Sequence, residues 1–146
     1  MGSALGVSDY RSLAELRYQI RRYLKFSEQA AHEARLESKQ HQLLLAIKGL
    51  PAGRRPLIGE LSERMQIRHH STVELVNRLA AHGYVERQRG IEDRREVVVA
   101  LAPKGERVLQ ELSLDHSAEL RTQGPILVAA LKRAMRTAAV KRGRNK

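Results

Sequence analysis

The sequence predicts a mostly α-helical chain with one small β-hairpin. Apolar residues recur at helical spacing over most of the 146 residues. This spacing gives way to the alternation typical of strands only between Tyr84 and Leu101. A hydrophobic fraction of 42% is enough to build a core, and the length corresponds to about one domain.

Two helices are predicted in the first fifty residues. The first covers residues 12–36 with a single apolar stripe, and Ser12 with Glu15 fits a capping box at its start. The second covers residues 38–50 and ends at Gly49 and the turn that follows it. The first helix is long for a small domain, so its stripe requires a partner.

A helix-turn-helix is predicted next. A short amphipathic helix over residues 56–65 is followed by a break and a second helix over residues 70–82. Ser71 fits the N-cap of this second helix, with Glu74 completing a capping box. We expect its buried stripe to comprise Val73, Val76, Leu79 and Ala80.

The hairpin follows directly, with strands over residues 84–89 and 96–101 joined by a turn. A hairpin in this position makes the unit a winged helix-turn-helix. Pro103 then begins a helix over residues 103–120, Gly124-Pro125 is expected to break it, and a last helix covers residues 126–140.

The amino-acid composition limits the classes of partner that the protein could bind. The chain has 27 Lys and Arg against 16 Asp and Glu, a net charge of +11, which favours DNA, RNA or an anionic membrane as partner. Aromatic residues make up only 3%, which disfavours stacking on single-stranded nucleic acid. No apolar run approaches the roughly 20 residues that span a bilayer, and the first nine residues do not form a secretory signal. We therefore expect a cytoplasmic protein without a membrane partner.

Catalysis and metal binding lack supporting motifs. The absence of Cys excludes disulfides, thiol redox chemistry and a Cys nucleophile. The six His residues show no zinc spacing, and no nucleophile elbow, phosphate loop or His-Glu-x-x-His occurs. We expect neither an enzyme nor a cofactor nor a metal.

Four stretches stand at a characteristic spacing: Leu75-Val76-Asn77-Arg78-Leu79, Gly83-Tyr84-Val85-Glu86-Arg87, Asp93-Arg94-Arg95 and Pro103-Lys104-Gly105. This pattern resembles the MarR (multiple antibiotic resistance regulator) family of bacterial transcription factors over about residues 13–140. The stretch Arg68-His69-His70-Ser71 also resembles a subgroup of that family. Two departures stand out. The family commonly has an acidic residue at Asn77, able to pair with a wing arginine, and usually has Thr or Ser at Ala102, where losing the cap costs about 1 kcal/mol.

The resemblance implies a homodimeric regulator of transcription that binds a pseudo-palindromic duplex site. Repression is the favoured action, although the residues do not separate it from activation, and a small-molecule effector is a further implied partner. In the cell such a protein would associate with the nucleoid when bound to DNA. The alternative is a winged-helix protein-interaction module that does not bind DNA. RNA is disfavoured because the A-form major groove is too narrow for a helix.

We expect two sets of side chains to contact DNA: polar residues of the second helix of the helix-turn-helix and arginines of the hairpin. The resemblance assigns a minor-groove contact to Arg94, while Asp93 is expected to orient Arg95, or a neighbouring residue, through a charge-assisted hydrogen bond. The full set is His69, His70, Ser71, Thr72, Asn77, Arg78, Arg87, Arg89, Arg94 and Arg95.

The terminal helices need a partner for their apolar stripes. We therefore predict dimerisation helices over residues 10–37 and 106–140 around a DNA-binding domain over residues 38–105. The alternative is a monomer in which these helices fold back on themselves. A flexible N-terminus over residues 1–9 and a basic, disordered tail over residues 141–146 complete the chain. The candidate interface residues are Tyr18, Ile20, Tyr23, Leu127, Leu131 and Met135, and the effector pocket that the resemblance implies would be lined by Tyr23, His32, Arg35 and His41.

Overall fold

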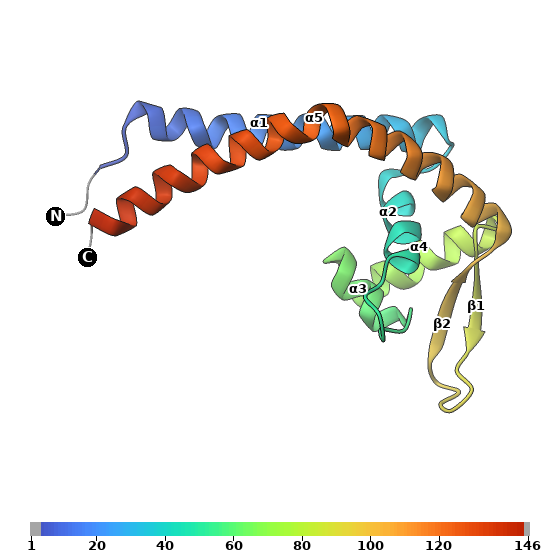
Figure 1. Cartoon of the computed structure of the whole chain (residues 1–146). Helices are drawn as coiled ribbons and strands as arrows, with labels where there is room; N and C mark the ends of the chain where they lie inside the picture. The colour runs from blue at the N-terminus through green and yellow to red at the C-terminus, as the bar shows by residue number, and fades with distance from the viewer. Residues whose placement is uncertain (1–3, 145–146) are drawn as a thin grey trace. The chain divides into compact units, whose positions relative to one another are not determined.

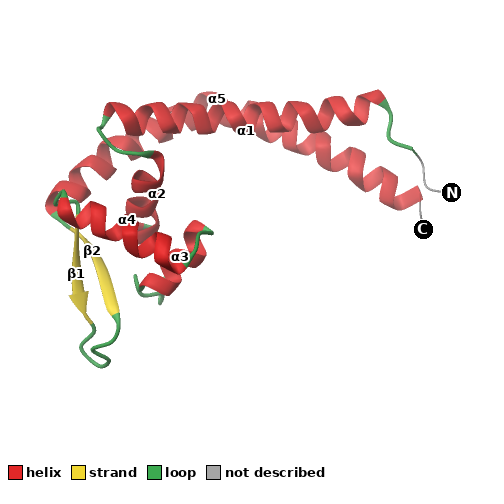
Figure 2. Ribbon diagram, turned by 180° about the vertical axis from the view of Figure 1, so that it is seen from behind, coloured by secondary structure: helices red, strands yellow, loops and turns green. Residues whose placement is uncertain are grey.

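The computed structural model describes residues 4–144, with side chains described as far as residue 136. The predicted helical fold with a hairpin wing is confirmed (Figures 1 and 2). Its elements are α1 (Val7–Glu33), α2 (Ser38–Lys48), α3 (Ile58–Met65), α4 (His69–Ala81), β1 (Val85–Arg89), β2 (Val97–Leu101) and α5 (Pro103–Arg144).

The chain divides into two compact units. One comprises Met1–Gln29 with Leu114–Lys146, and we call its described part, in which α1 and α5 run alongside each other, the helical pair (Figure 1). The other comprises Ala30–Ser113 and is called the winged unit. The winged unit therefore contains the last residues of α1 and the first turns of α5 as well as the predicted residues 38–105.

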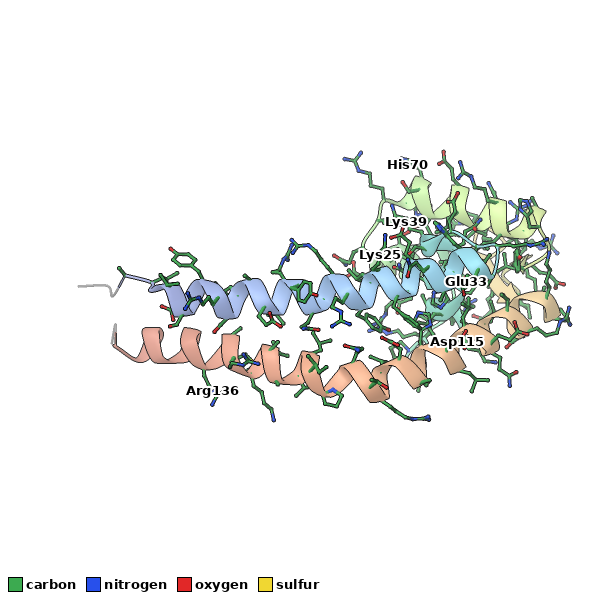
Figure 3. All side chains as sticks on the ribbon, turned by 90° about the horizontal axis from the view of Figure 1, so that it is seen from above. Lys25, Glu33, Lys39, His70, Asp115 and Arg136 are labelled. Atoms are coloured by element: carbon green, nitrogen blue, oxygen red, sulfur yellow. The ribbon has the colours of Figure 1, made fainter. Side chains whose placement is uncertain are left out.

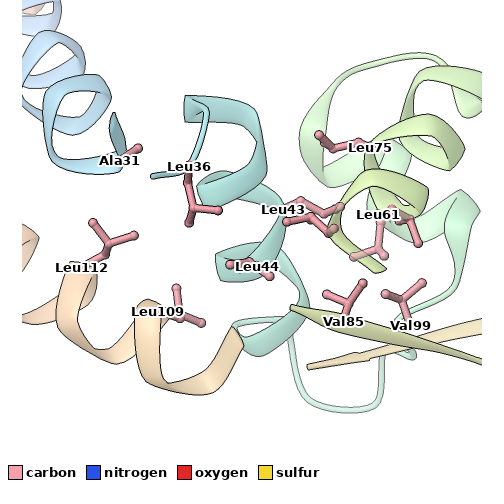
Figure 4. Close-up of a cluster of buried hydrophobic side chains, with 12 residues drawn as sticks. Ala31, Leu36, Leu43, Leu44, Leu61, Leu75, Val85, Val99, Leu109 and Leu112 are labelled. Carbon is pink, nitrogen blue, oxygen red and sulfur yellow. The ribbon is translucent and has the colours of Figure 1, made fainter. Parts of the chain in front are cut away.

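The core of the winged unit is aliphatic. Leu43 and Leu44 of α2 meet Leu61 of α3, and Val85 and Val99 close the cluster from the hairpin (Figure 4). Burying each such side chain contributes roughly 1.5–3 kcal/mol. This cluster fixes the positions of α3, α4 and the hairpin relative to one another.

The hairpin is antiparallel, with Val85 opposite Leu101 and Arg89 opposite Val97. The loop before α3 joins its open edge. Leu57 forms a bridge with Val98, and the Val99 N–H donates to the Pro56 carbonyl at 2.9 Å. The base of the wing is therefore hydrogen-bonded to the start of the helix-turn-helix.

The base of the hairpin also packs against the first turn of α5. The Ala102 N–H donates to the Tyr84 carbonyl at 3.0 Å. Lys104 Nζ donates to the His82 carbonyl at 2.8 Å and lies 4.3 Å from the centre of the Tyr84 ring. At Gly105 the two backbones approach so closely that a Cβ would stand 2.1 Å from the Tyr84 oxygen.

The start of α1 differs from the prediction. The helix begins at Val7, so the expected capping box at Ser12 is wrong. The Gly6 N–H donates to Asp9 Oδ2 at 2.8 Å, and the Ser12 hydroxyl donates to the Ser8 carbonyl at 3.1 Å, as it does inside a helix. Part of the predicted flexible N-terminus is thus helical, and residues 1–3 lie outside the described residues.

The predicted break at Gly124-Pro125 is also wrong, because α5 runs through it for 42 residues. Proline removes one helical hydrogen bond, the one that the Arg121 carbonyl would accept. Both Arg121 and Pro125 are exposed, so water can solvate that carbonyl. The helix extends over 141–144 of the predicted disordered tail, and residues 145–146 lie outside the described residues.

The close approach at Gly105 predicts a large cost for Gly105→Ala. The added methyl group meets backbone rather than a flexible side chain, so α5 has to move away from β1. We expect a loss of about 2 kcal/mol or more in the free energy of unfolding, measured by urea denaturation. Gly124→Ala is the matched control, since nothing lies within 4 Å of its added Cβ. In a helix interior this change should stabilise by about 0.5–1 kcal/mol. Equal effects at the two positions would contradict the packing at the hairpin base.

Candidate nucleic-acid interface

The inner face of α4 determines which of its residues face outward. Thr72, Leu75, Val76 and Leu79 are buried. Of the predicted stripe, Val76 and Leu79 are confirmed, whereas Val73 and Ala80 are only half-buried. The stripe is therefore rotated slightly from the prediction, because Thr72 takes an inner position.

Thr72 is removed from the predicted DNA contacts. Its side chain is 0% exposed. Its hydroxyl donates to the Arg68 carbonyl at 3.1 Å and accepts from the Ser62 hydroxyl at 2.8 Å. Thr72 therefore joins α3 to α4 from inside, and nothing in the local sequence marks this, since Ser62 lies ten residues away.

The start of α4 is open. Its N-cap is Arg68, with no side-chain cap, so the predicted capping by Ser71 and Glu74 is wrong. The first N–H groups of a helix without a side-chain cap are available to bind phosphate. His69 and His70 lie exposed in this first turn, which contains no acidic residue (Figure 3).

Asn77 joins α4 to the wing. Its carbonyl oxygen accepts a hydrogen bond from Arg87 Nη1 on β1. The link that an acidic residue would make is therefore present here with a neutral acceptor. A bidentate contact to adenine needs both the oxygen and the amide group of Asn77, and the oxygen is engaged. Arg78, one position further along, is exposed.

Asp93 holds Arg95 in the turn of the wing. Its two carboxylate oxygens accept from Arg95 Nε at 3.2 Å and Nη2 at 3.3 Å, and Oδ1 also accepts the Arg95 backbone N–H at 3.0 Å. The side-chain hydrogen bond from Arg95, followed by the backbone one, lowers the pKa of Asp93. This is the contact expected of Asp93.

The rest of the wing tip presents two further features. Arg94 is exposed, and its carbonyl accepts from Arg89 Nη1 at 3.5 Å. Ile91 is 97% exposed, and the sequence reasoning did not single it out. Arg55 of the α2–α3 loop, also missed, pairs with Glu96 at 3.0 Å and ties that loop to the wing. Its partner is 41 positions away, so no local pattern signals it.

The helical pair has little apolar core of its own. Among its described residues, the buried apolar side chains are Ala130 and Ala134. Twelve of the fourteen large apolar side chains that are exposed in the described chain belong to this unit. Of the predicted interface residues, Tyr18, Leu131 and Met135 are exposed, while Ile20, Tyr23 and Leu127 are half-buried.

Between its helices the pair contains a buried histidine that the sequence reasoning missed. His116 Nε2 lies 2.8 Å from Ser27 Oγ. Its ring meets the rings of Tyr23 and Phe26 edge-on, with centroids 6.1 and 5.3 Å away. Tyr23 thus packs inside the helical pair. Because Tyr23 and His116 lie far apart in the sequence, no local pattern predicts their contact.

The effector pocket stays a prediction. Tyr23 belongs to the helical pair, whereas His32, Arg35 and His41 belong to the winged unit. His32 and Arg35 are exposed and His41 is buried. A separate groove of about 510 Å³ lies on the helical pair and is lined by Tyr18, Arg21, Arg22, Lys25, Phe26, Gln29 and Glu119.

No three His, Asp or Glu side chains in the part of the chain that the structure describes gather into a group able to hold a metal ion. No helix in that part of the chain is long and apolar enough to cross a membrane.

Part of the chain is similar to a known protein family. Residues 36–96 match the family model described as the MarR family. The chain is 39% identical over 64 residues to an uncharacterized HTH-type transcriptional regulator of Bacillus subtilis, YsmB. That match covers 44% of the chain and 44% of YsmB, less than half the length of either.

Solved structures extend the likeness to the terminal helices. AbsC, a MarR family transcriptional regulator from Streptomyces coelicolor, is similar with a TM-score of 0.74 and 16% identity, over 99% of both chains. A mutant of MarR from E. coli in complex with operator DNA is similar with a TM-score of 0.65 and 18% identity, over 84% of this chain and 89% of that one. At these identities the structures establish the fold.

The Asp93–Arg95 pair can be tested by titration. Arg95→Ala removes the largest cause of the lowered pKa of Asp93, so that pKa should rise toward its ordinary value of 3.8 in carbon-detected NMR. The sign follows from the depressed pKa: the pair is complete above the ordinary value and is lost as the pH falls through the lowered pKa. Arg94→Ala, its exposed neighbour, should leave the pKa of Asp93 unchanged. An equal rise in both variants would contradict the specific pairing.

Proposed function

We propose that this chain is a DNA-binding regulator of transcription that acts as a homodimer on a pseudo-palindromic duplex site. The observation that carries the proposal is the exposed polar and cationic surface shared by α4 and the wing on one compact unit. It is formed by the exposed side chains of His69, His70, Arg78, Arg87, Arg89, Arg94 and Arg95, with the half-buried Ser71 on the same helix. We place the protein in the bacterial cytoplasm, associated with the nucleoid when bound, and assign it no catalytic role.

In this proposal α4 enters the major groove. Its uncapped first turn meets a phosphate, and Arg78 reaches a base edge or a neighbouring phosphate. The contact between Asn77 and Arg87 joins this helix to the wing. The net charge of +11 supports the choice of a polyanionic partner.

The wing supplies the second contact. Arg94 stands exposed beside the Asp93–Arg95 pair, where a long cationic side chain can reach the narrow minor groove of A·T-rich DNA. Gly90 makes the tight turn possible, because a Cβ there would lie 2.5 Å from the Asp93 carbonyl oxygen. The similar MarR structure from E. coli is a complex with operator DNA, which supports the same partner here.

A second copy of the chain is the proposed partner of the helical pair. Its twelve exposed large apolar side chains and its two buried alanines are the pattern expected of a helix pair that completes its core across an interface. A two-fold dimer would place two α4 helices about one DNA turn, roughly 34 Å, apart.

We assign repression, in which the dimer occupies a promoter. An effector would act by binding more tightly to a dimer in which the spacing of the two α4 helices is altered. The groove on the helical pair supports an effector of anionic, aromatic character. It presents three cationic side chains, Arg21, Arg22 and Lys25, beside the rings of Tyr18 and Phe26.

Arg94→Ala tests the DNA contact. Losing a minor-groove contact should weaken binding by about 1–3 kcal/mol, most at sites with an A·T-rich flank, and should flatten the salt dependence of the affinity. Filter binding to duplex DNA over a salt series measures both quantities. Arg107→Ala, an exposed arginine of α5, removes the same charge and should have a small effect. Unchanged affinity and salt slope in Arg94→Ala would reject the wing contact, and no duplex binding by the wild type at low salt would favour a protein-interaction module.

Leu131→Glu tests the dimer. A charge at this exposed apolar position should dissociate the dimer and lower the affinity for a two-fold site, as measured by sedimentation and filter binding. Thr122→Glu is the control, because it lies nine positions earlier, on the opposite side of a helix with 100° per residue. A wild-type mass retained by Leu131→Glu would reject the interface.

A further inference from the structure

Glu74 stands in the middle of the outward face of α4. With Thr72, Leu75, Val76 and Leu79 turned inward, the helical repeat places residues 70, 74, 77 and 81 on the opposite side. Glu74 is exposed, and it is the acidic residue of α4. His70 lies one turn before it and Asn77 one turn after it.

The carboxylate of Glu74 has no structural task in the described part of the chain. It does not cap α4, because the N-cap is Arg68. Arg78 lies one turn away, at the spacing of a helical ion pair, yet no ion pair or hydrogen bond of Glu74 forms with any described residue. A negative charge at the centre of a face that approaches phosphates is unfavourable unless a donor on DNA meets it.

The edges of the bases limit what that donor can be. A carboxylate only accepts hydrogen bonds, and in the major groove the donors are the amino groups of cytosine and adenine. The amino group of adenine lies between two acceptors, its own N7 and the O4 of the paired thymine, which repel a carboxylate, whereas the amino group of cytosine adjoins an acceptor on one side alone, the O6 of the paired guanine. Cytosine is therefore the base that matches Glu74.

We propose that Glu74 is a specificity-determining residue of this chain, whose carboxylate accepts a hydrogen bond from the exocyclic amino group of a cytosine in each half-site. The inference rests on the proposed function, since it requires α4 in the major groove. Asn77 does not compete as acceptor, because its carbonyl oxygen is held by Arg87. Glu74 also disfavours duplexes that lack this cytosine, because its charge then faces the DNA without a donor.

The test is a selection from a pool of duplex oligonucleotides with a randomised central segment, followed by affinity measurements on the selected duplex and on its cytosine-substituted forms. The proteins are the full-length wild type, Glu74→Gln and the control Glu111→Gln. Glu111 is exposed on α5, so the control removes the same charge from a position outside the outward face of α4. Because both positions are exposed, both variants should fold as the wild type does.

We expect the wild type and Glu111→Gln to select a cytosine at one symmetrical position of each half-site, with about tenfold preference over other bases. Glu74→Gln should lose that preference and retain the rest of the selected sequence. It should also bind duplexes without the cytosine more tightly than the wild type does, an effect that a residue with a merely structural role would not produce.

Two results would overturn the inference and leave the proposed function intact. One is a selected sequence that is the same for Glu74→Gln and the wild type, and the other is a wild-type sequence with no selected cytosine. Failure of all three proteins to retain any duplex at low salt would instead reject the proposed function, and the inference with it.

Discussion

The packing of the inner stripe of α4 is the constraint on which the rest of the winged unit depends. Once Leu75, Val76 and Leu79 join the aliphatic core, the helical repeat leaves no freedom over which residues face solvent. The polar member of that stripe, Thr72, is accommodated because its hydroxyl is paired on both sides. The residues on the outward face of α4 are therefore determined by hydrophobic burial on the other side of the helix rather than by any property of that face itself.

The polar links around the wing act on position more than on stability. The pairs Asp93–Arg95 and Arg55–Glu96 involve largely exposed arginines, and exposed ion pairs of this kind contribute little to the free energy of unfolding. They restrict long side chains and loops to one arrangement. With the bond from Arg87 to Asn77, they give the hairpin a defined direction relative to α4.

Periodicity was sufficient to predict the architecture, because apolar spacing records burial directly. The alternation of Val97, Val99 and Leu101 located β2, and the stripe of α4 was right at Val76 and Leu79. Helix starts were not predictable in this way. Ser12-x-x-Glu15 and Ser71-x-x-Glu74 both fit a capping box, yet both lie within helices that begin earlier, since the same residue types are also tolerated inside a helix. Contacts such as Ser62 with Thr72 depend on tertiary packing that no local pattern contains.

The contacts of Tyr84 with the first turn of α5 hold the base of the hairpin and the start of that helix together. The Ala102 N–H donates to the Tyr84 carbonyl, and the side chain of Lys104 donates to the His82 carbonyl. At Gly105 the two backbones already lie so close that α5 cannot move nearer to Tyr84. A rotation of this first turn has to carry the root of β1 with it. Within the winged unit, the orientation of the hairpin is thus coupled directly to that of the first turn of α5.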